Sequence, residues 1–231
     1  MSENHRISTG CQPLDSLLGG GVERGTVTQV YGPPASGKTN IALNTAIETA
    51  VNDGTAVYID SEGVSIDRFE QLLAGYDGDT DSLSSRIIFK EIHDFDEQQQ
   101  AIQDIEDLAE EADLIVLDSA TGFYRIRRSE DETEGDALRK IAQQITFLLS
   151  LARKHDLAVL ITNQVYTDPD SDRPRPLGGH TLQHWTGTVI RLDRFRGGNR
   201  RATLEKHRSQ PAGEAIQFQI LESGIKGESQ S

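Results

Sequence analysis

The sequence has little cysteine and no long hydrophobic run. A single cysteine, Cys11, excludes an internal disulfide and any cysteine-rich zinc site. No apolar stretch approaches the roughly 20 residues that cross a bilayer. The N-terminal segment from Met1 to Gly10 also lacks the basic-then-apolar order of a signal peptide. We therefore predict a cytoplasmic protein with no membrane contact, in which Cys11 serves packing.

Lysine is also scarce, and acidic residues dominate the charge. Only six of the 23 cationic residues are lysine, and 37 acidic residues bring the formal net charge to −14. Such a surface is expected in a halophilic cell, where molar internal salt screens surface charge, although an ordinary acidic cytosolic protein is the alternative. Because nucleic acids are polyanions, this charge argues against nucleic-acid binding at ordinary salt unless basic residues cluster locally.

The order of the predicted elements is that of an α/β protein. A chain of 231 residues suits one domain. Strands are predicted at Thr26–Tyr31, Thr55–Asp60, Arg86–Glu91, Leu114–Asp118 and Leu157–Thr162, and helices at Lys38–Val51, Phe95–Glu111 and Asp136–Lys154. Leu114–Asp118 and Leu157–Thr162 are apolar on both faces, which is typical of buried parallel strands. We predict a mostly parallel central sheet flanked by helices, as in a P-loop NTPase core.

The C-terminal part follows a different pattern. Three β-like runs, Thr186–Phe195, Arg201–His207 and Glu214–Leu221, are separated by turns and not by helices. They predict an antiparallel extension of the parallel sheet. One domain is expected over residues 1–224, followed by a disordered tail at 225–231. Trp185, which precedes these strands, is predicted to lie in the core.

One segment matches the phosphate-binding pattern G-x-x-x-x-G-K-[ST]. It lies between a predicted strand and a predicted helix and consists of Gly32, Pro33, Pro34, Ala35, Ser36, Gly37, Lys38 and Thr39. Its glycines let the backbone curl so that N–H groups and the helix N-terminus point at phosphate oxygens. Pro33 and Pro34 have no N–H group, so the donors must come mainly from Ser36–Thr39. Lys38 is expected to reach the β- and γ-phosphates of ATP, and the Thr39 hydroxyl to bind Mg²⁺.

Three polar residues follow predicted strands, at the sheet edge where ligands bind in open α/β sheets. Asp118 ends a buried strand and is expected to hold Mg²⁺ through its water shell, although a turn or cap role is the alternative. Glu62 can accept a hydrogen bond from water and align it on the γ-phosphorus; otherwise it is an exposed or helix-capping residue. Gln164 can sense the γ-phosphate, unless it is a plain loop amide.

The ordered set of motifs resembles the RecA-fold recombinases of archaea and eukaryotes. The motifs that carry the resemblance are Ile7–Cys11, Leu17–Gly21, Gly32–Thr39, Tyr58–Gly63, Leu117–Thr121, Ile161–Val165 and Pro176–Gly179. The resemblance implies a RecA-like core that binds ATP and Mg²⁺ in homologous recombination and DNA repair. It further implies weak, DNA-dependent ATP hydrolysis and assistance to the main archaeal recombinase.

The chain departs from a full recombinase of this family in two places. Nothing before residue 7 matches the family's N-terminal helix-hairpin-helix domain, and there is no Phe-x-x-Ala linker. We therefore do not expect long strand-exchange filaments, while smaller homo-oligomers stay open.

Arginines cluster in two segments expected to be mobile loops, Gly122–Gly135 and Tyr166–Gly179. Arg125, Arg127 and Arg128 follow Phe123 and Tyr124 in the segment that corresponds to the family's first DNA loop. Arginine next to aromatic residues suits single-stranded DNA, since it pairs with phosphate and stacks on bases.

The second segment corresponds to the family's second DNA loop and contains Arg173 and Arg175. For both loops the alternative is that the arginines only balance neighbouring acids.

The late strands are basic as well. Between Arg191 and Arg208, six arginines and Lys206 stand against Asp193 and Glu205, so the local formal charge is +5. Lys206 and Arg208 alternate along a strand and can point to one side. Some RecA-like ATPases place such a Lys-x-Arg pair on the neighbouring subunit's γ-phosphate. A surface salt-bridge strand is the alternative.

A protein of another class would share many of these features. A single-core relative of circadian KaiC, which is an ATP-switched regulatory protein without DNA contact, also has the phosphate loop, the Lys-x-Arg strand and the Leu-Leu-Gly-Gly-Gly opening. The arginine-rich first loop and Ser119-Ala120-Thr121 favour the recombinase interpretation.

Overall fold

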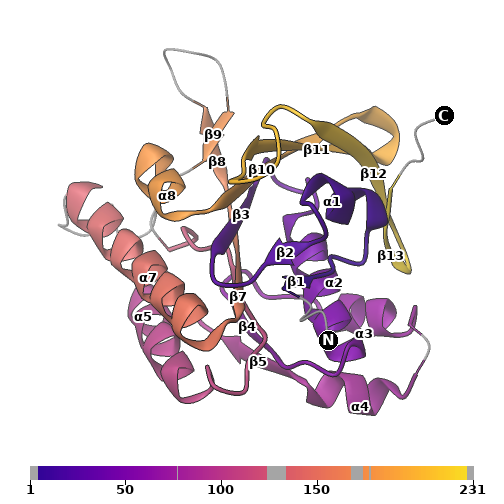
Figure 1. The fold of residues 1–231 in the computed structure, drawn as a ribbon, viewed down its shortest axis with the longest axis horizontal. Coiled ribbons are helices and arrows are strands. Elements are labelled where there is room, and N and C mark those ends of the chain that lie inside the picture. The colour runs from indigo at the N-terminus through magenta and orange to yellow at the C-terminus, as the bar shows by residue number, and fades with distance from the viewer. Residues whose placement is uncertain (1–4, 77, 124–133, 168–173, 177, 228–231) are drawn as a thin grey trace.

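A nine-stranded sheet forms the centre of the computed structural model, which describes residues 5–76, 78–123, 134–167, 174–176 and 178–227 (Figure 1). Its strand order is β13-β12-β11-β10-β3-β7-β6-β4-β5. The strands are β3 (Val27–Tyr31), β4 (Ala56–Asp60), β5 (Ile87–Glu91), β6 (Leu114–Asp118), β7 (Ala158–Asn163), β10 (Thr188–Arg194), β11 (Asn199–Lys206), β12 (Ala215–Leu221) and β13 (Gly224–Gly227).

The six strands from β10 to β5 pair in parallel, and β11, β12 and β13 extend the sheet in antiparallel fashion. The predicted architecture is therefore confirmed, with one correction. We expected the antiparallel part to begin at Thr186–Phe195, but β10 runs parallel to β3. The reason is helix α8 (Gly179–Trp185), which carries the chain back across the sheet before β10 begins.

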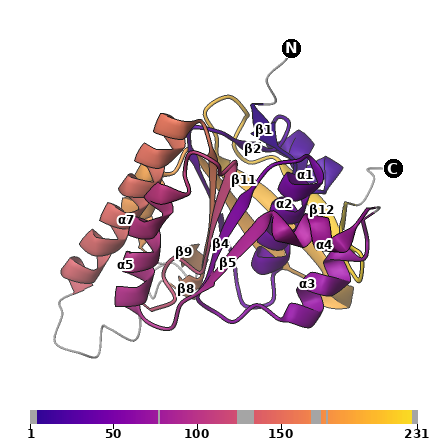
Figure 2. The ribbon, with the colours of Figure 1, turned by 90° about the horizontal axis from the view of Figure 1, so that it is seen from below.

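Helices cover both faces of the sheet (Figure 2). One face carries α2 (Lys38–Val51), α3 (Ile66–Leu73) and α4 (Thr80–Ser85), with α1 (Gln12–Leu17) packed beside β12 and β13. The other face carries α5 (Phe95–Asp104) and α7 (Glu134–His155), with α8 packed against α7. The predicted helix at Phe95–Glu111 is shorter than expected, because the chain tightens into a 3₁₀ turn at Ile105–Asp107.

The alternation of side chains along β6 explains the two-faced core. Leu114 and Val116 pack on the side of α2, whereas Ile115 and Leu117 pack on the side of α5 and α7. All are fully buried, and burial of such a side chain stabilises the fold by about 1.5–3 kcal/mol. This is the pattern that an all-apolar parallel strand requires.

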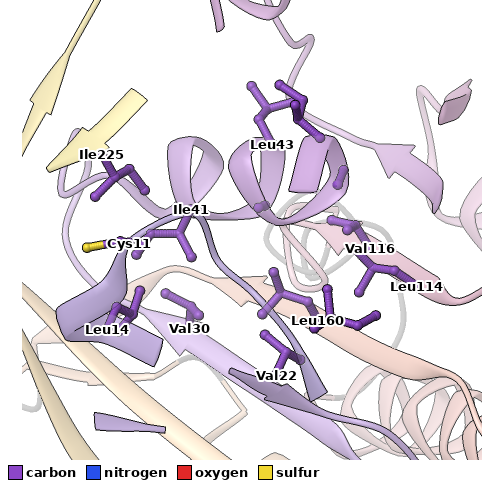
Figure 3. Close-up of a cluster of buried hydrophobic side chains, with 14 of the residues drawn as sticks. Cys11, Leu14, Val22, Val30, Ile41, Leu43, Leu114, Val116, Leu160 and Ile225 are labelled. Atoms are coloured by element: carbon purple, nitrogen blue, oxygen red, sulfur yellow. The ribbon is translucent and has the colours of Figure 1, made fainter. Parts of the chain in front are cut away.

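The cluster under α2 also receives Cys11, as predicted (Figure 3). Its thiol lies with Leu14, Val30, Ile41 and Ile225, and burial raises the pKa of Cys11. A buried thiol with a raised pKa is a packing group and not a nucleophile.

Two other predictions are wrong. Trp185 ends α8 with 39% of its surface exposed, edge-on to His184, because α8 turns this side chain away from both core clusters. Residues 225–227 were assigned to a disordered tail but belong to β13, which pairs with β12 and buries Ile225. The strand is short and flanked by polar residues, so local pattern alone did not mark it.

Two small ladders complete the architecture. Strands β1 (Arg6–Ile7) and β2 (Val22–Glu23) pair at the N-terminal end. Strands β8 (Val165–Thr167) and β9 (Pro174–Pro176) pair within the segment that was expected to be a mobile loop. Among the described residues, no helix is long and apolar enough to cross a bilayer.

Candidate nucleotide-binding site

The phosphate loop joins β3 to α2, as the motif predicted. The loop needs unusual backbone at two points, since Ala35 and Gly37 have positive φ angles of 59° and 106°. Glycine is needed at Gly32 for another reason: a Cβ there would lie 2.7 Å from the Leu192 carbonyl of β10. The close approach of β10 to the loop therefore leaves no room for a side chain at position 32.

Lys38 is the first residue of α2 and is almost fully buried. Its Nζ donates hydrogen bonds to the carbonyls of Gly32, at 3.1 Å, and Pro33, at 3.2 Å. Burial lowers the pKa of Lys38, and the negative charges of Glu62 and Asp118 partly oppose this effect. The ammonium is therefore held within the loop, facing the carboxylates.

The start of α2 fits an anionic ligand. No side chain caps this helix, and its first N–H groups have no partner within the helix. The hydroxyl of Ser36 is buried without a hydrogen-bond partner in the described part of the chain. An uncapped N-terminus, an unpaired hydroxyl and an ammonium together suit phosphate oxygens. These residues fit the triphosphate of a nucleotide.

Asp118 ends β6 beside the phosphate loop, as expected. It accepts hydrogen bonds from the Tyr58 hydroxyl at 2.6 Å, from Thr162, and from the Thr39 side chain. Burial raises the pKa of Asp118, and these three hydroxyl groups oppose the rise. A bound cation would favour its ionised form.

The residues near Asp118 suit Mg²⁺, but they do not suit a metal ion whose ligands are all protein side chains. Within the described ranges, no group of three His, Cys, Asp or Glu residues could hold a metal. The Thr39 hydroxyl would supply an oxygen ligand, and Asp118 would hold the ion through its water shell. Mg²⁺ usually completes its shell with waters and substrate phosphates.

Glu62 and Gln164 come together from the ends of β4 and β7. The Gln164 Nε2 donates to the Glu62 Oε1 at 2.7 Å. Asp60, which was not among the predicted site residues, shapes the turn that follows β4: its carboxylate accepts the N–H groups of Glu62 at 3.0 Å, Gly63 at 3.1 Å, and Val64. Asp60 thus orients the backbone that carries Glu62.

The phosphate loop, Glu62 and Gln164 meet on one hollow of about 250 Å³, and Asp118 and Asp60 do not line it. It is lined by Pro34, Ala35, Gly37, Lys38, Thr39, Asn40, Glu62 and Gln164. Asn40 was not predicted, and its Oδ1 accepts two hydrogen bonds from the guanidinium of Arg68, at 3.0 and 2.8 Å. Nothing in local sequence links Asn40 to Arg68, which comes from α3. The tertiary structure therefore adds Asn40, Asp60, Tyr58 and Thr162 to the predicted site.

The predicted finger residues have partners within their own chain. Lys206 donates to the carbonyls of Gln183 at 2.6 Å and Thr186 at 2.7 Å. Arg208 forms a salt bridge with Glu23 of β2. The prediction that the two side chains alternate along one strand is wrong, because β11 ends at Lys206 and Arg208 lies in the bend that follows, where it contacts a different element. A role on a neighbouring subunit stays a prediction for both residues.

The structure yields a pH-dependent stability prediction for Arg208. Glu23 is buried; burial raises its pKa, but the hydrogen bond from Arg208 and the charges of Arg6 and Arg208 lower it below its ordinary value. The stabilisation is therefore present above the unfolded pKa of about 4.3 and is lost as the pH falls through the lower folded value. We expect Arg208→Ala to cost about 1 kcal/mol at neutral pH, since Arg6 stays near Glu23.

Urea unfolding of the wild type and of the Arg208→Ala variant at pH 7 and pH 3, at one KCl concentration, measures the difference in their free energies of unfolding. Arg153→Ala, on the exposed end of α7, is the control. A cost that is equal at the two pH values would contradict the assignment.

Most of the predicted DNA-contacting residues lie outside the described residues. This holds for Arg125, Arg127, Arg128 and Arg173. Arg175 lies in β9, opposite Tyr166 of β8.

Comparison with known proteins agrees with the fold. The family model described as Rad51 matches residues 2–228. The DNA repair and recombination protein RadB of Halobacterium salinarum is 65% identical over 225 residues, which cover 96% of this chain and 95% of that protein. The RadB of Methanococcoides burtonii is 43% identical over 222 residues, which cover 96% of this chain and 97% of that protein.

A solved structure gives the same result. The crystal structure of the RadB recombinase matches with a TM-score of 0.84 and 35% identity, covering 96% of this chain and 100% of that chain. The order of motifs, the sheet and these matches lead to one conclusion. The chain belongs to the Rad51 family of RecA-fold proteins.

Proposed function

We propose that this chain binds ATP with Mg²⁺, hydrolyses it slowly, and acts in homologous recombination and DNA repair. The observation that carries the nucleotide part is the meeting of the phosphate loop, Glu62 and Gln164 on one hollow. The biological part is supported by relatives named as DNA repair and recombination proteins. Because its proposed ligand is DNA, we expect the protein to act in the cytoplasm.

The residues that line the hollow, together with the buried Asp118, would each contribute to binding or hydrolysis. Lys38 and the N–H groups of Ser36–Thr39 would bind the phosphates, and Asp118 and Thr39 would hold Mg²⁺. Mg²⁺, when bound, offsets phosphate charge and polarises the phosphoryl oxygens. The Glu62 carboxylate accepts a hydrogen bond from water and aligns that water for attack. Gln164 holds Glu62 in place through its amide.

The proposal includes DNA, single-stranded DNA above all, as the macromolecular ligand. The two arginine-containing segments begin close to the site: Thr121 bonds to Asn163, and Gln164, which bonds to Glu62, directly precedes β8. A conformational change caused by the binding or hydrolysis of ATP can therefore reach the first residues of both segments. The main archaeal recombinase is the expected protein partner, because the family resemblance implies assistance to it.

A titration with labelled single-stranded DNA tests the DNA part. We expect binding in molar KCl that depends on ATP, and weaker binding when Arg125, Arg127 and Arg128 are all replaced by alanine. Loss of three phosphate contacts should make the slope of log affinity against log salt shallower by about 2. The matched control removes three cations outside both loops, by Arg86→Ala, Arg153→Ala and Lys154→Ala.

The outcomes separate the two functional classes. If the wild-type chain binds ATP but no DNA at any salt concentration, the chain is an ATP-switched interaction protein instead. Light scattering with and without ATP and DNA, in the same buffer, reports the oligomeric state in which either activity occurs.

A further inference from the structure

The turn between β10 and β11 is the most basic described segment that the proposed function does not use. Residues 194–201, here called the arginine hairpin, contain four arginines and no acidic residue. The two strands place Arg194 directly opposite Arg200. Like charges in facing positions of a ladder destabilise it. A cluster of this kind in a chain of charge −14 is suited to an anionic ligand.

The charges of the arginine hairpin are not neutralised by nearby acids. Throughout the described ranges, no ion pair involves Arg194, Arg196, Arg200 or Arg201. The preceding Arg191 of β10 behaves differently, since it pairs with both Asp193 at 3.3 Å and Glu205 at 3.2 Å. The hairpin therefore carries a local excess of positive charge at its tip.

An aromatic side chain stands among these arginines. Phe195 has 44% of its surface exposed, and the Arg201 guanidinium lies 4.9 Å from the centre of its ring. The backbone N–H of Phe195 donates to the Asn199 carbonyl at 2.9 Å, which closes the turn that carries the ring. An exposed ring supported by a guanidinium is a platform on which a base can stack.

The arginine hairpin borders the phosphate loop. Arg200 donates to the carbonyl of Ala35 at 3.4 Å, and a Cβ at Gly37 would lie 3.5 Å from the Arg200 Cδ. Burial, followed by the charge of Arg194, lowers the pKa of Arg200. Arg200 therefore serves to attach the hairpin to the loop, which leaves Arg194 and Arg196 as the exposed cations.

We propose that the arginine hairpin binds single-stranded nucleic acid, with phosphates at Arg194 and Arg196 and a base stacked on Phe195. The combination favours nucleic acid over an acidic protein segment, because an acidic peptide needs the cations but gains nothing specific from the ring. This surface adds to the DNA binding of the proposed function and rests on it only for the class of ligand.

A charge-matched pair of variants tests the electrostatic part. Arg194→Ala with Arg196→Ala removes two cations from the hairpin, and Arg153→Ala with Lys154→Ala removes two from the distant end of α7. Anisotropy titrations with fluorescein-labelled oligo(dT), over a KCl series reaching the molar range, measure affinity and its salt slope. We expect the hairpin variant to lose about 1.4 in slope, which is two phosphates on a single strand. The control should match the wild type.

A second pair of variants tests the stacking part. Phe195→Leu keeps apolar bulk without an aromatic face, and Phe195→Tyr keeps the face. We expect the leucine variant to bind oligo(dT) about ten-fold more weakly, with an unchanged salt slope, and the tyrosine variant to bind like the wild type. Both variants change the same exposed position, and circular dichroism of each variant checks the fold.

The outcomes distinguish this proposal from the loop contacts. If the hairpin variants bind oligo(dT) like their controls while the Arg125, Arg127 and Arg128 triple variant does not, the proposal is wrong and the proposed function stands. If the hairpin effect persists in the triple-variant background, the hairpin binds independently of the loop. Unchanged oligo(dT) binding together with lost binding to polyglutamate would assign the hairpin to an acidic protein partner and overturn the proposal.

Discussion

Lys38→Ala is expected to abolish ATP binding. The ammonium is buried in the loop and already bonded to two loop carbonyls, so its position is set before a ligand arrives. Each hydrogen bond to a charged group contributes up to about 3 kcal/mol, so the loss of a single contact between Lys38 and the phosphates already weakens the affinity about a hundred-fold. Isothermal titration calorimetry with ATP and Mg²⁺ measures the loss directly.

The stability of the Lys38→Ala protein serves as an internal check. Burial lowers the pKa of Lys38, which means that the folded chain bears a cost for the charge. The variant should therefore unfold at a temperature no lower than the wild type when ATP is absent. Lys154→Ala, exposed on α7, is the control for removal of a lysine charge. Unchanged nucleotide affinity in the Lys38 variant would refute the site.

Glu62→Gln is expected to keep ATP bound and to remove hydrolysis. Glutamine has the same shape, and its carbonyl oxygen can accept the bond that Gln164 now donates to Glu62. The turn also survives, because Asp60 holds it through backbone N–H groups. What is lost is the negative charge that orients the attacking water, so turnover should fall by about 10²- to 10⁴-fold.

Single-turnover phosphate release, measured with and without single-stranded DNA, gives this rate even when the wild-type enzyme is slow. ATP affinity is measured in parallel and should change little. Glu70→Gln, exposed on the neighbouring α3, removes a charge of the same kind without contact with the hollow. Turnover that survives in the Glu62 variant would show that another group aligns the water.

The parts of the site that sequence predicted are those that short spacing encodes. Lys38 and Thr39 follow from one motif between a strand and a helix, and the helix begins at Lys38 as the motif requires. Glu62, Asp118 and Gln164 follow because parallel strands end at one edge, which brings their next residues together. The bond between Gln164 and Glu62 is the outcome of that rule.

The supporting groups could not be predicted, because each depends on contact between distant segments. Tyr58 and Asp118 are 60 positions apart, and Asn40 and Arg68 meet only because α3 packs beside α2. The direction of β10 was missed for the same reason, since it depends on how α8 carries the chain across the sheet. The exposure of Trp185 depends on where that helix packs.

Local sequence by itself determined the order of strands and helices, the phosphate loop and the placement of three acidic or amide residues at strand ends. These features depend on residue type and on short-range spacing, which do not depend on how distant segments pack. Only the tertiary structure decided which hydroxyls hold Asp118, that Arg208 pairs with Glu23, and that the arginine hairpin borders the phosphate loop. Such contacts arise from packing across the sheet, and packing joins residues that no local pattern relates.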